Sequence, residues 1–256
     1  MNTSRREAMQ AYLLQEGYCG VERLASRFGV SVATVHRDLS ALSASGLVRK
    51  VHGGAVGSPS APLPAMASGA DRQDSHFCQR LEQNRSAKMM IAALAEALIE
   101  SGDILFLDSS TTCLCLARRL QSSRLTTLSV VTNSVLIAQE FFRFPPHFML
   151  MCLGGNFNGQ LNSFLGRMAQ EHLRQVRLTK AFYSGVGLDS SGLSTYHEDH
   201  AEFLRQVLGQ AEENCLLLDS SKFNRGGLFR ICGRERIGRL LSDQPPPPEL
   251  WNGPAV

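Results

Sequence analysis

The sequence has no long apolar run and no closely spaced cysteine pair. None of its apolar runs approaches the roughly 18 residues of a membrane helix, and the polar first ten residues lack the apolar core of a signal peptide. The seven cysteines are an odd number without a C-x-x-C pair, which argues against a disulfide framework and a zinc site. We therefore expect a cytoplasmic protein with reduced, buried cysteines, without a membrane segment, cofactor or metal.

Net charge is also small, but its distribution is uneven. The chain of 256 residues carries +3 overall, and its first sixty residues hold seven Lys or Arg against four Asp or Glu, while the remainder holds 19 of each. This excess hints at a polyanionic partner for the first quarter of the chain. The length and the 43% hydrophobic content predict a small domain followed by a larger one.

Apolar periodicity predicts two helices in the first thirty residues. The first begins at a capping box formed by Ser4 and Glu7 and ends at Gly17, and the second ends at Gly29. The predicted core-facing residues are Ala8, Met9, Tyr12 and Leu13 in the first helix and Val21, Leu24, Ala25 and Phe28 in the second.

A third helix is predicted after Ser31, whose side chain can cap it. Only Gly29 and Val30 separate it from the second helix, which is typical of a helix-turn-helix. Its predicted buried stripe is Val32, Val35, Leu39 and Leu42, and its opposite face carries Ala33, Thr34, Arg37, Ser40 and Ala41. Small residues around one arginine suit close approach to a DNA groove.

The segment "LVRKVHGGAV", residues 47–56, predicts a β-hairpin with a tight turn at Gly53 and Gly54. It carries Arg49, Lys50 and His52, so it has the character of a basic wing beside the recognition helix. The alternative is a three-helix bundle with merely solvated arginines, but the order of the elements and the local charge favour a winged helix.

These residues resemble the DeoR-type winged helix, whose pattern includes VS-x-x-T-[IV]-R-R-D-L and R-x-H-G-G-A. Val30, Ser31, Thr34, Val35, Arg37, Asp38 and Leu39 match the first motif, and Arg49 with residues 52–55 matches the second. His36 stands where the family has arginine and is cationic only at lower pH. The resemblance implies that double-stranded operator DNA is bound by Ser31, Thr34, His36, Arg37, Arg49, Lys50, His52 and Gly53.

Residues 57–75 are rich in Pro, Gly, Ser and Ala and have no period, which indicates a linker. We predict a DNA-binding domain over 1–57, a linker over 58–75, an α/β domain over 76–243 and a Pro-rich tail over 244–256. The tail, with its single Trp251, has the composition of an unstructured polyproline-like arm.

Between linker and tail, helical segments alternate with short apolar runs. Helices are expected near 86–100, 112–120, 134–142 and 200–212, with a further segment near 163–175; the runs are "ILFLD", "LSVVTN", "FMLMCLGG", "AFYSGVG" and "NCLLLD". This alternation predicts an α/β fold with a mainly parallel sheet covered by helices on both faces.

Ligands bind such sheets at the carboxyl ends of the strands. There, residues 108–112 offer hydroxyls and a helix N-terminus suited to phosphate, Thr132 and Asn133 offer partners for hydroxyls, and residues 219–222 end in Lys222. Each Ser/Thr cluster alone is better explained as a helix cap, and their shared position at strand ends makes a ligand site an equally good explanation.

The second domain resembles the DeoR-type effector domain, which has the fold of sugar-phosphate isomerases and CoA transferases. The matches are residues 108–112 to D-x-G-[ST]-T, 131–134 to V-T-N-S, Gly154 and Gly155 to a glycine pair, 219–223 to D-S-S-K-F, and Arg80 and Lys88 to basic positions. The implied effector residues are Asp108, Ser109, Ser110, Thr111, Thr112, Asn133 and Lys222. Ser110 replaces the glycine, so it either strains the turn or adds a donor.

The resemblance implies a homo-oligomeric repressor, a dimer or tetramer, of a carbohydrate operon that a phosphorylated sugar relieves. The alternative is an isomerase-like enzyme with a general base among Asp189, Glu198, Asp199 and Glu202, but it leaves the DNA-binding module unexplained. His197 and His200 suggest a metal cluster, yet no further ligands match them, which favours a solvated loop or a helix start.

Overall fold

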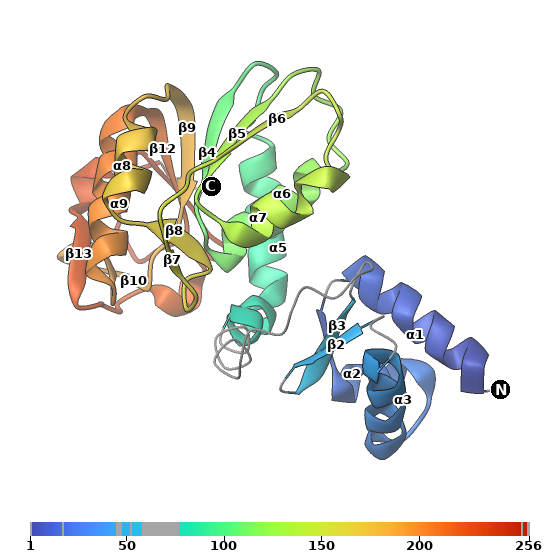
Figure 1. The fold of residues 1–256 in the computed structure, drawn as a ribbon. Helices are drawn as coiled ribbons and strands as arrows, with labels where there is room; N and C mark the ends of the chain where they lie inside the picture. The colour runs from blue at the N-terminus through green and yellow to red at the C-terminus, as the bar shows by residue number, and fades with distance from the viewer. Residues whose placement is uncertain are drawn as a thin grey trace. The chain divides into compact units, whose positions relative to one another are not determined.

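The computed structural model describes residues 2–16, 18–44, 48–51, 53–57, 77–251 and 253–254 (Figure 1). The chain divides into two compact units, Met1–Gln79 and Arg80–Val256. No described helix combines the length and apolarity needed to cross a membrane.

The first unit is a winged helix. Its helices are α1 (Asn2–Glu16), α2 (Val21–Phe28) and α3 (Val32–Ala44), and its strands are β1 (Tyr18–Gly20), β2 (Val48–Val51) and β3 (Gly54–Gly57). The strands form an antiparallel sheet in the order β1-β3-β2. Met9, Leu13, Leu24, Val35 and Leu39 are fully buried at its centre, so the apolar stripes of all three helices meet in one core.

The helix-turn-helix is confirmed, with local differences. Gly29 ends α2 in the left-handed conformation, φ 61°, which glycine adopts without steric cost. Helix α1 begins at Asn2, before the capping box that the sequence predicts at Ser4. Ala8 is exposed, and Val32 is 44% exposed because it is the first residue of α3, ahead of the turn that packs on the core.

The wing depends on two glycines with different roles. Val51 pairs with Gly54, and Gly53 takes φ 79° in the turn between them. A Cβ on Gly54 would lie 2.4 Å from the Cys19 carbonyl oxygen in the adjacent strand β1. Gly53 therefore provides the turn conformation, whereas Gly54 permits the close approach of β1 and β3.

The second unit contains a six-stranded parallel sheet in the order β14-β12-β9-β4-β5-β6. Its strands are β4 (Ile104–Leu107), β5 (Ser129–Thr132), β6 (Met149–Cys152), β9 (Leu178–Tyr183), β12 (Ala211–Leu217) and β14 (Arg239–Leu241). One face is covered by α5 (Arg85–Glu96), α6 (Thr111–Leu120) and α7 (Val135–Glu140), and the other by α8 (Arg167–Leu173) and α9 (Glu198–Gln210) (Figure 1). The predicted α/β architecture is confirmed.

Smaller elements complete this unit. They are the strands β7 (Asn156–Asn158), β8 (Ser163–Leu165), β10 (Gly187–Asp189), β11 (Gly192–Thr195) and β13 (Phe229–Cys232), and the 3-10 turns η1 (Phe141–Arg143), η2 (Ser220–Lys222) and η3 (Arg234–Arg236). Strands β7 and β8 pair with each other, and β10, β11 and β13 form a separate antiparallel sheet.

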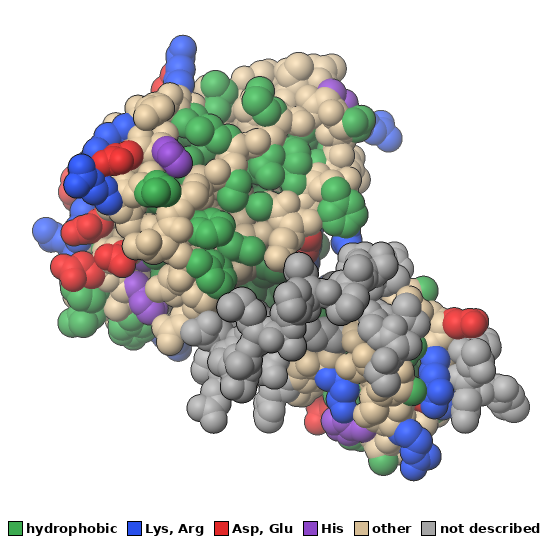
Figure 2. Space-filling view, in the orientation of Figure 1, with side chains coloured by type: hydrophobic (Ala, Val, Ile, Leu, Met, Phe, Trp, Pro, Cys, Tyr) green, Lys and Arg blue, Asp and Glu red, His purple; other side chains and the backbone are tan. Residues whose placement is uncertain are grey.

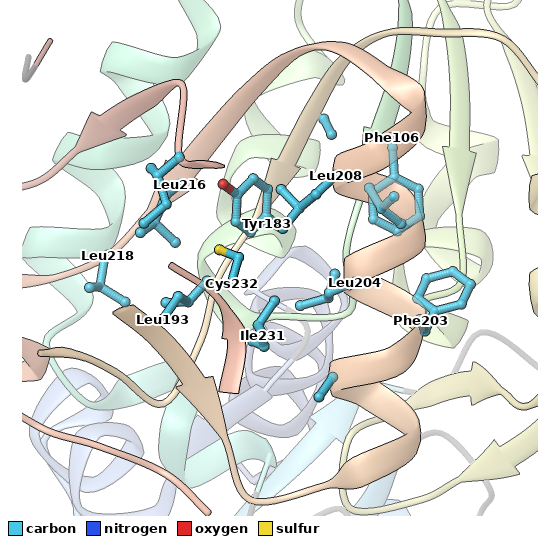
Figure 3. Packing of buried hydrophobic residues seen from close by; sticks show 14 of the residues in the cluster. Phe106, Tyr183, Leu193, Phe203, Leu204, Leu208, Leu216, Leu218, Ile231 and Cys232 are labelled. Atoms are coloured by element: carbon cyan, nitrogen blue, oxygen red, sulfur yellow. The ribbon is translucent and has the colours of Figure 1, made fainter. Parts of the chain in front are cut away.

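The main core lies between α9, the parallel sheet and the sheet that contains β13 (Figure 3). Phe203 of α9 lies 5.8 Å from Phe106 of β4, measured between ring centroids. Leu204 and Leu208 extend this apolar face toward Tyr183 and Leu216. Burial of these side chains stabilises the domain by about 1.5–3 kcal/mol each.

The prediction of an unstructured tail is wrong. Trp251 is only 7% exposed and, with Leu250, belongs to the main core. The Trp251 indole N–H donates to the Pro254 carbonyl at 3.3 Å, and Arg234 donates to the Glu249 carbonyl at 2.7 Å. Two large apolar side chains therefore anchor a segment whose prolines alone suggest an extended arm.

The prediction that the cysteines are buried holds for five of the seven. Cys78 is half-buried and Cys152 is exposed, whereas the other five are buried. The exposed position of Cys152 follows from its strand, β6, which is the last in the parallel sheet.

Candidate functional site

The exposed side of α3 carries most of the residues predicted to bind DNA. Ser31 caps the helix, since its Oγ accepts a hydrogen bond from the Thr34 backbone N–H at 3.3 Å, and the two hydroxyls lie 3.0 Å apart. His36 and Arg37 are exposed, and Thr34 is half-buried. The helix thus presents small polar groups and one guanidinium to the solvent.

The wing contributes a lysine to the same side. The Lys50 ammonium of β2 donates to Ser40 Oγ at 3.0 Å, and Ser40 Oγ donates to the His36 carbonyl at 2.7 Å. Gly53 is exposed in the turn of the wing. The Arg49 side chain and His52 lie outside the described residues.

Asp38 has a structural role that the sequence motif did not reveal. Its carboxylate is 1% exposed and accepts hydrogen bonds from the Nε atoms of Arg5 and Arg6, each at 2.8 Å. Burial raises the pKa of Asp38, but the bonds and charges of the two arginines outweigh it, so the pKa falls below its ordinary value. Asp38 therefore ties α3 to α1.

In the second unit, four neighbouring strands end in polar residues at one edge of the sheet. The order β12-β9-β4-β5 brings together the segments that follow these strands, residues 219–222, 184–185, 108–112 and 132–134. Parallel strands end at the same edge, so segments far apart in sequence share one site.

Asp108 organises the loop after β4. One carboxylate oxygen accepts from the Ser110 N–H at 2.7 Å and the other from the Ser184 N–H at 2.8 Å. Asp108 is buried and joins its own loop to the end of β9. It therefore shapes the site by fixing two backbone segments.

Ser110 does not strain the turn. Its φ of −71° and ψ of 155° are accessible to any residue, and its Oγ accepts from the Cys113 N–H at 3.1 Å. Its hydroxyl thus caps α6, and the loop needs no glycine at this position.

Two buried acceptors beside these loops have no partner among the described residues, Thr112 Oγ1 and Asn133 Oδ1. The amide nitrogen of Asn133 donates to Ser163 Oγ at 2.8 Å and to the Phe164 carbonyl at 3.3 Å. Since buried polar atoms are normally satisfied, these two atoms indicate places where a ligand or water completes the structure.

Basic side chains gather at the same edge. The Lys222 ammonium donates to the Gly185 carbonyl at 2.9 Å and lies 3.8 Å from Asp219. The buried Lys88 ammonium donates to the carbonyls of Arg80 and Gln83. Arg80 and Lys222 interact electrostatically with Asp108, and Lys88 interacts with Lys222 and Asp219.

Burial lowers the pKa values of these three basic side chains. Burial, reinforced by the charge of Lys222, lowers the pKa of Lys88 to about 8. Burial also lowers the pKa of Lys222 and of Arg80, while the charge of Asp108 acts in the opposite direction on both. An anion bound here would stabilise the charged forms.

Sequence reasoning missed Ser184 and Gly185 and assigned no site role to His200 or Thr195. The small polar end of "AFYSGVG" resembles the other strand ends and is a usable signal for the first two. His200 lies in the first turn of α9, as the helix-start alternative predicts, but it is buried and bonded to Thr195. Nothing in the local sequence predicts that burial.

None of the acids of the enzyme alternative is buried. Asp189 accepts from the Ser191 N–H at 2.8 Å in the β10–β11 turn, and Glu198, Asp199 and Glu202 are exposed on α9. Within the described ranges, no three His, Cys, Asp or Glu side chains form a group suited to a metal ion.

The geometry defines a class: a winged-helix unit joined to an α/β unit with basic and hydroxyl side chains at the ends of its strands. Residues 5–60 match the DeoR-like helix-turn-helix domain, and residues 83–244 match the DeoR C terminal sensor domain. The chain belongs to the DeoR family and is a DNA-binding transcriptional regulator.

Similar proteins span nearly the whole chain. The transcriptional repressor AccR of Agrobacterium fabrum is 30% identical over 94% of this chain and 90% of its own length. The L-fucose operon activator of Escherichia coli K12 is 30% identical (95% and 96%), and the lactose phosphotransferase system repressor of Lactococcus lactis is also 30% identical (88% and 85%).

Among solved structures, similarity is partial. A ribose 5-phosphate isomerase A from Methanocaldococcus jannaschii gives a TM-score of 0.37 at 17% identity, covering 53% of each chain. The eIF2B delta subunit of Chaetomium thermophilum gives 0.44 at 14% identity, covering 67% of this chain and 60% of its own.

Proposed function

We propose that this regulator represses a carbohydrate-metabolism operon in the cytoplasm and is released from operator DNA by a phosphorylated sugar. The observation that carries the proposal is the cluster of Arg80, Lys88 and Lys222 beside the hydroxyl-rich N-terminus of α6, in a chain that also bears a winged helix. Two relatives are named as repressors, one of a lactose system, and a third as an L-fucose operon activator.

The phosphate would lie beside the loop at residues 108–112, near the buried Lys88 and the half-buried Lys222. Buried ammonium groups are costly without a counter-charge, and the N–H groups at the start of α6 favour an anion. The proposed contacts are Ser109, Ser110, Thr111, Thr112, Asn133 and Lys222, with Asp108 shaping the loop. The proposal includes no catalytic step.

Operator DNA would lie against α3 and the wing. In this proposal Ser31, Thr34, His36 and Arg37 face the major groove, while Lys50 and the turn at Gly53 meet the backbone, together with Arg49 and His52. The Lys50–Ser40 hydrogen bond supports a shared surface, because it holds the wing's charge beside the exposed side of α3. Major-groove contacts by a recognition helix and backbone contacts by flanking elements are the usual division of roles.

The regulator would act as a dimer or tetramer, with β6 as the contact. One edge of β6 pairs with β5, and its other edge pairs with no strand in the described part of the chain. Met149 and Met151 are 63% and 40% exposed on it. On the visible side of the second unit, hydrophobic side chains are spread over the middle and charged ones lie mostly toward the periphery (Figure 2).

An identical strand from a second copy suits this edge. An uncharged apolar strand is complementary to itself, and antiparallel pairing across a two-fold axis would satisfy the free backbone groups of both copies. Two copies would also place two winged-helix units on the paired half-sites of operator DNA. A sugar phosphate would cause release only if it binds one arrangement of the copies more tightly than the other.

The test combines ligand binding and DNA release in the full chain. Thermal shift measurements with inorganic phosphate and a panel of pentose and hexose phosphates identify a ligand, because selective binding to the folded state raises the melting temperature. Fluorescence anisotropy on DNA from upstream of the encoding gene then measures release. We expect at least one sugar phosphate to exceed inorganic phosphate in both measurements.

Two variants should separate the two activities. Lys222→Ala should keep the DNA affinity and lose the response to ligand, whereas Arg37→Ala should weaken specific DNA binding by about 1–3 kcal/mol and keep the ligand shift. Arg177→Ala is the charge-matched control, since Arg177 forms an exposed ion pair with Glu212. A normal ligand response in Lys222→Ala, or unchanged DNA affinity in Arg37→Ala, contradicts the corresponding half of the proposal.

A further inference from the structure

His200 is a buried histidine beside the cationic site that the phosphate contacts leave unused. It lies in the first turn of α9 and is 8% exposed. Its Nδ1 lies 3.2 Å from Oγ1 of Thr195, a buried residue at the end of β11. One ring nitrogen is therefore fixed by the protein, and the ring has a defined position.

The other ring nitrogen is available. Nε2 forms no hydrogen bond with a described residue, and it is not among the fully enclosed polar atoms that lack a partner. It therefore retains contact with solvent although the residue as a whole is buried. Thr195 follows Ser194, whose carbonyl accepts from the Val186 N–H at 2.9 Å, and Val186 follows Gly185, which accepts from Lys222. The Thr195–His200 pair therefore lies beside the segment after β9 that contacts Lys222.

The imidazole is uncharged at neutral pH. Burial lowers the pKa of His200 to about 4; the charges of His197 and Arg80 also lower it, and only Asp108 opposes them. His200 thus adds no positive charge for a phosphate. A neutral imidazole nitrogen donates or accepts one hydrogen bond, depending on the tautomer.

We propose that His200, oriented by Thr195, recognises a hydroxyl group of the sugar and so determines which phosphorylated sugar the sensor accepts. A sugar hydroxyl both donates and accepts, so it pairs with Nε2 in either tautomer, whereas a phosphate oxygen without a proton only accepts. The inference rests on the proposed function and divides the site: Arg80, Lys88 and Lys222 bind the phosphate, and His200 with Thr195 binds the carbohydrate. A site that hydrogen-bonds a ligand hydroxyl strongly rejects an analogue that lacks this hydroxyl, because the buried polar groups of the site are then left unpaired.

The test compares three probes on the same variants by isothermal titration calorimetry. The probes are inorganic phosphate and the tightest-binding sugar phosphate of the panel, together with an epimer of that sugar. His200→Phe keeps an aromatic ring and removes both nitrogens. We expect its affinity for the sugar phosphate to fall by about tenfold, the effect of one lost hydrogen bond. Its affinity for inorganic phosphate should stay within about twofold, and its preference over the epimer should shrink by the same tenfold factor.

Two further variants keep the result interpretable. Thr195→Val removes the hydroxyl that orients the ring and should reduce the preference over the epimer without changing phosphate binding. His200→Gln restores a hydrogen-bonding group, should recover part of the sugar affinity, and serves where the phenylalanine variant does not fold. His172→Phe is the matched control, since His172 is exposed on α8 and should leave every value unchanged.

Each outcome is decisive. Equal losses for phosphate and sugar phosphate, or no loss for either, would overturn the assignment of His200 while leaving the sensor function intact. If the wild-type chain binds no sugar phosphate more tightly than inorganic phosphate, the proposed function fails and this inference fails with it.

Discussion

At the scale of single residues, Asp38 shows how a motif position can be structural. Its place between exposed Arg37 and buried Leu39 gives no sign of its partners, because Arg5 and Arg6 lie more than thirty residues earlier. Sequence periodicity identified the exposed arginine and the buried leucine. The ion pairs follow from the packing of α3 on α1, which short-range patterns do not contain.

Asp38→Asn should lower the free energy of unfolding of the winged-helix unit by about 1.5–3 kcal/mol, the range for hydrogen bonds to charged groups. Because the native pKa of Asp38 is below its ordinary value of 3.8, the stabilisation is present above about pH 4 and is lost as pH falls through the native pKa. Urea unfolding followed by far-ultraviolet circular dichroism at several pH values measures both effects.

Glu171→Gln is the control for this prediction, since it breaks an exposed ion pair with Arg167 on α8. Such exposed pairs contribute little to stability, because water and salt screen the two charges. If Asp38→Asn is as stable as this control at neutral pH, the ties from Asp38 to α1 do not hold α3 in place.

At the scale of elements, the sequence predicts long periodic segments well and short ones poorly. The stripes of α2 and α9 and the apolar runs of β4, β5 and β9 carry enough periodic positions to be recognised. Strands β1, β7 and β10 have three residues each and take their extended form from a neighbouring strand. The partner, rather than the local sequence, determines them.

The wing gives an element-scale prediction. Gly54→Ala should separate β3 from β1, because the added Cβ would approach the Cys19 carbonyl oxygen to 2.4 Å. We expect weaker operator binding in the anisotropy assay, with unchanged binding of ligand by the second unit.

Gly209→Ala is the matched control. Gly209 lies in α9, and an added Cβ would come no closer than 3.9 Å to the Arg236 guanidinium. Gly209 is the second-last residue of this helix, and alanine has a higher helix propensity than glycine, so this variant should not lose stability. Normal DNA affinity of Gly54→Ala would show that the wing tolerates the wider spacing.

At the scale of the whole molecule, the fold class and the strand-end site are predictable, whereas the tail and the exposed edge are not. The order of parallel strands brings Asp108, Asn133 and Lys222 to one edge, as alternating β and α segments imply. The burial of Leu250 and Trp251 depends on the completed core, to which residues distant in sequence contribute. The exposure of Met149 depends on β6 being the last strand.

Assembly is the prediction that belongs to this scale. Met151→Lys should shift the chain toward monomers in sedimentation velocity experiments, because each two-fold contact would bring two like charges together. Met90→Lys is the control, since Met90 is 53% exposed on α5, away from β6.

Both variants should retain the melting temperature of the wild type, because both side chains are already exposed. An unchanged sedimentation coefficient for Met151→Lys would show that the copies associate through a different face, or that the chain is a monomer.

The burial of Trp251 has a consequence for how the two units are observed. It is the single tryptophan of the chain, and it lies in the core of the second unit. Indole emission therefore follows the sensor unit alone, and unfolding of the winged helix leaves that signal unaltered. If the unfolding transitions measured by indole emission and by circular dichroism differ in one sample, the winged-helix unit and the second unit unfold independently.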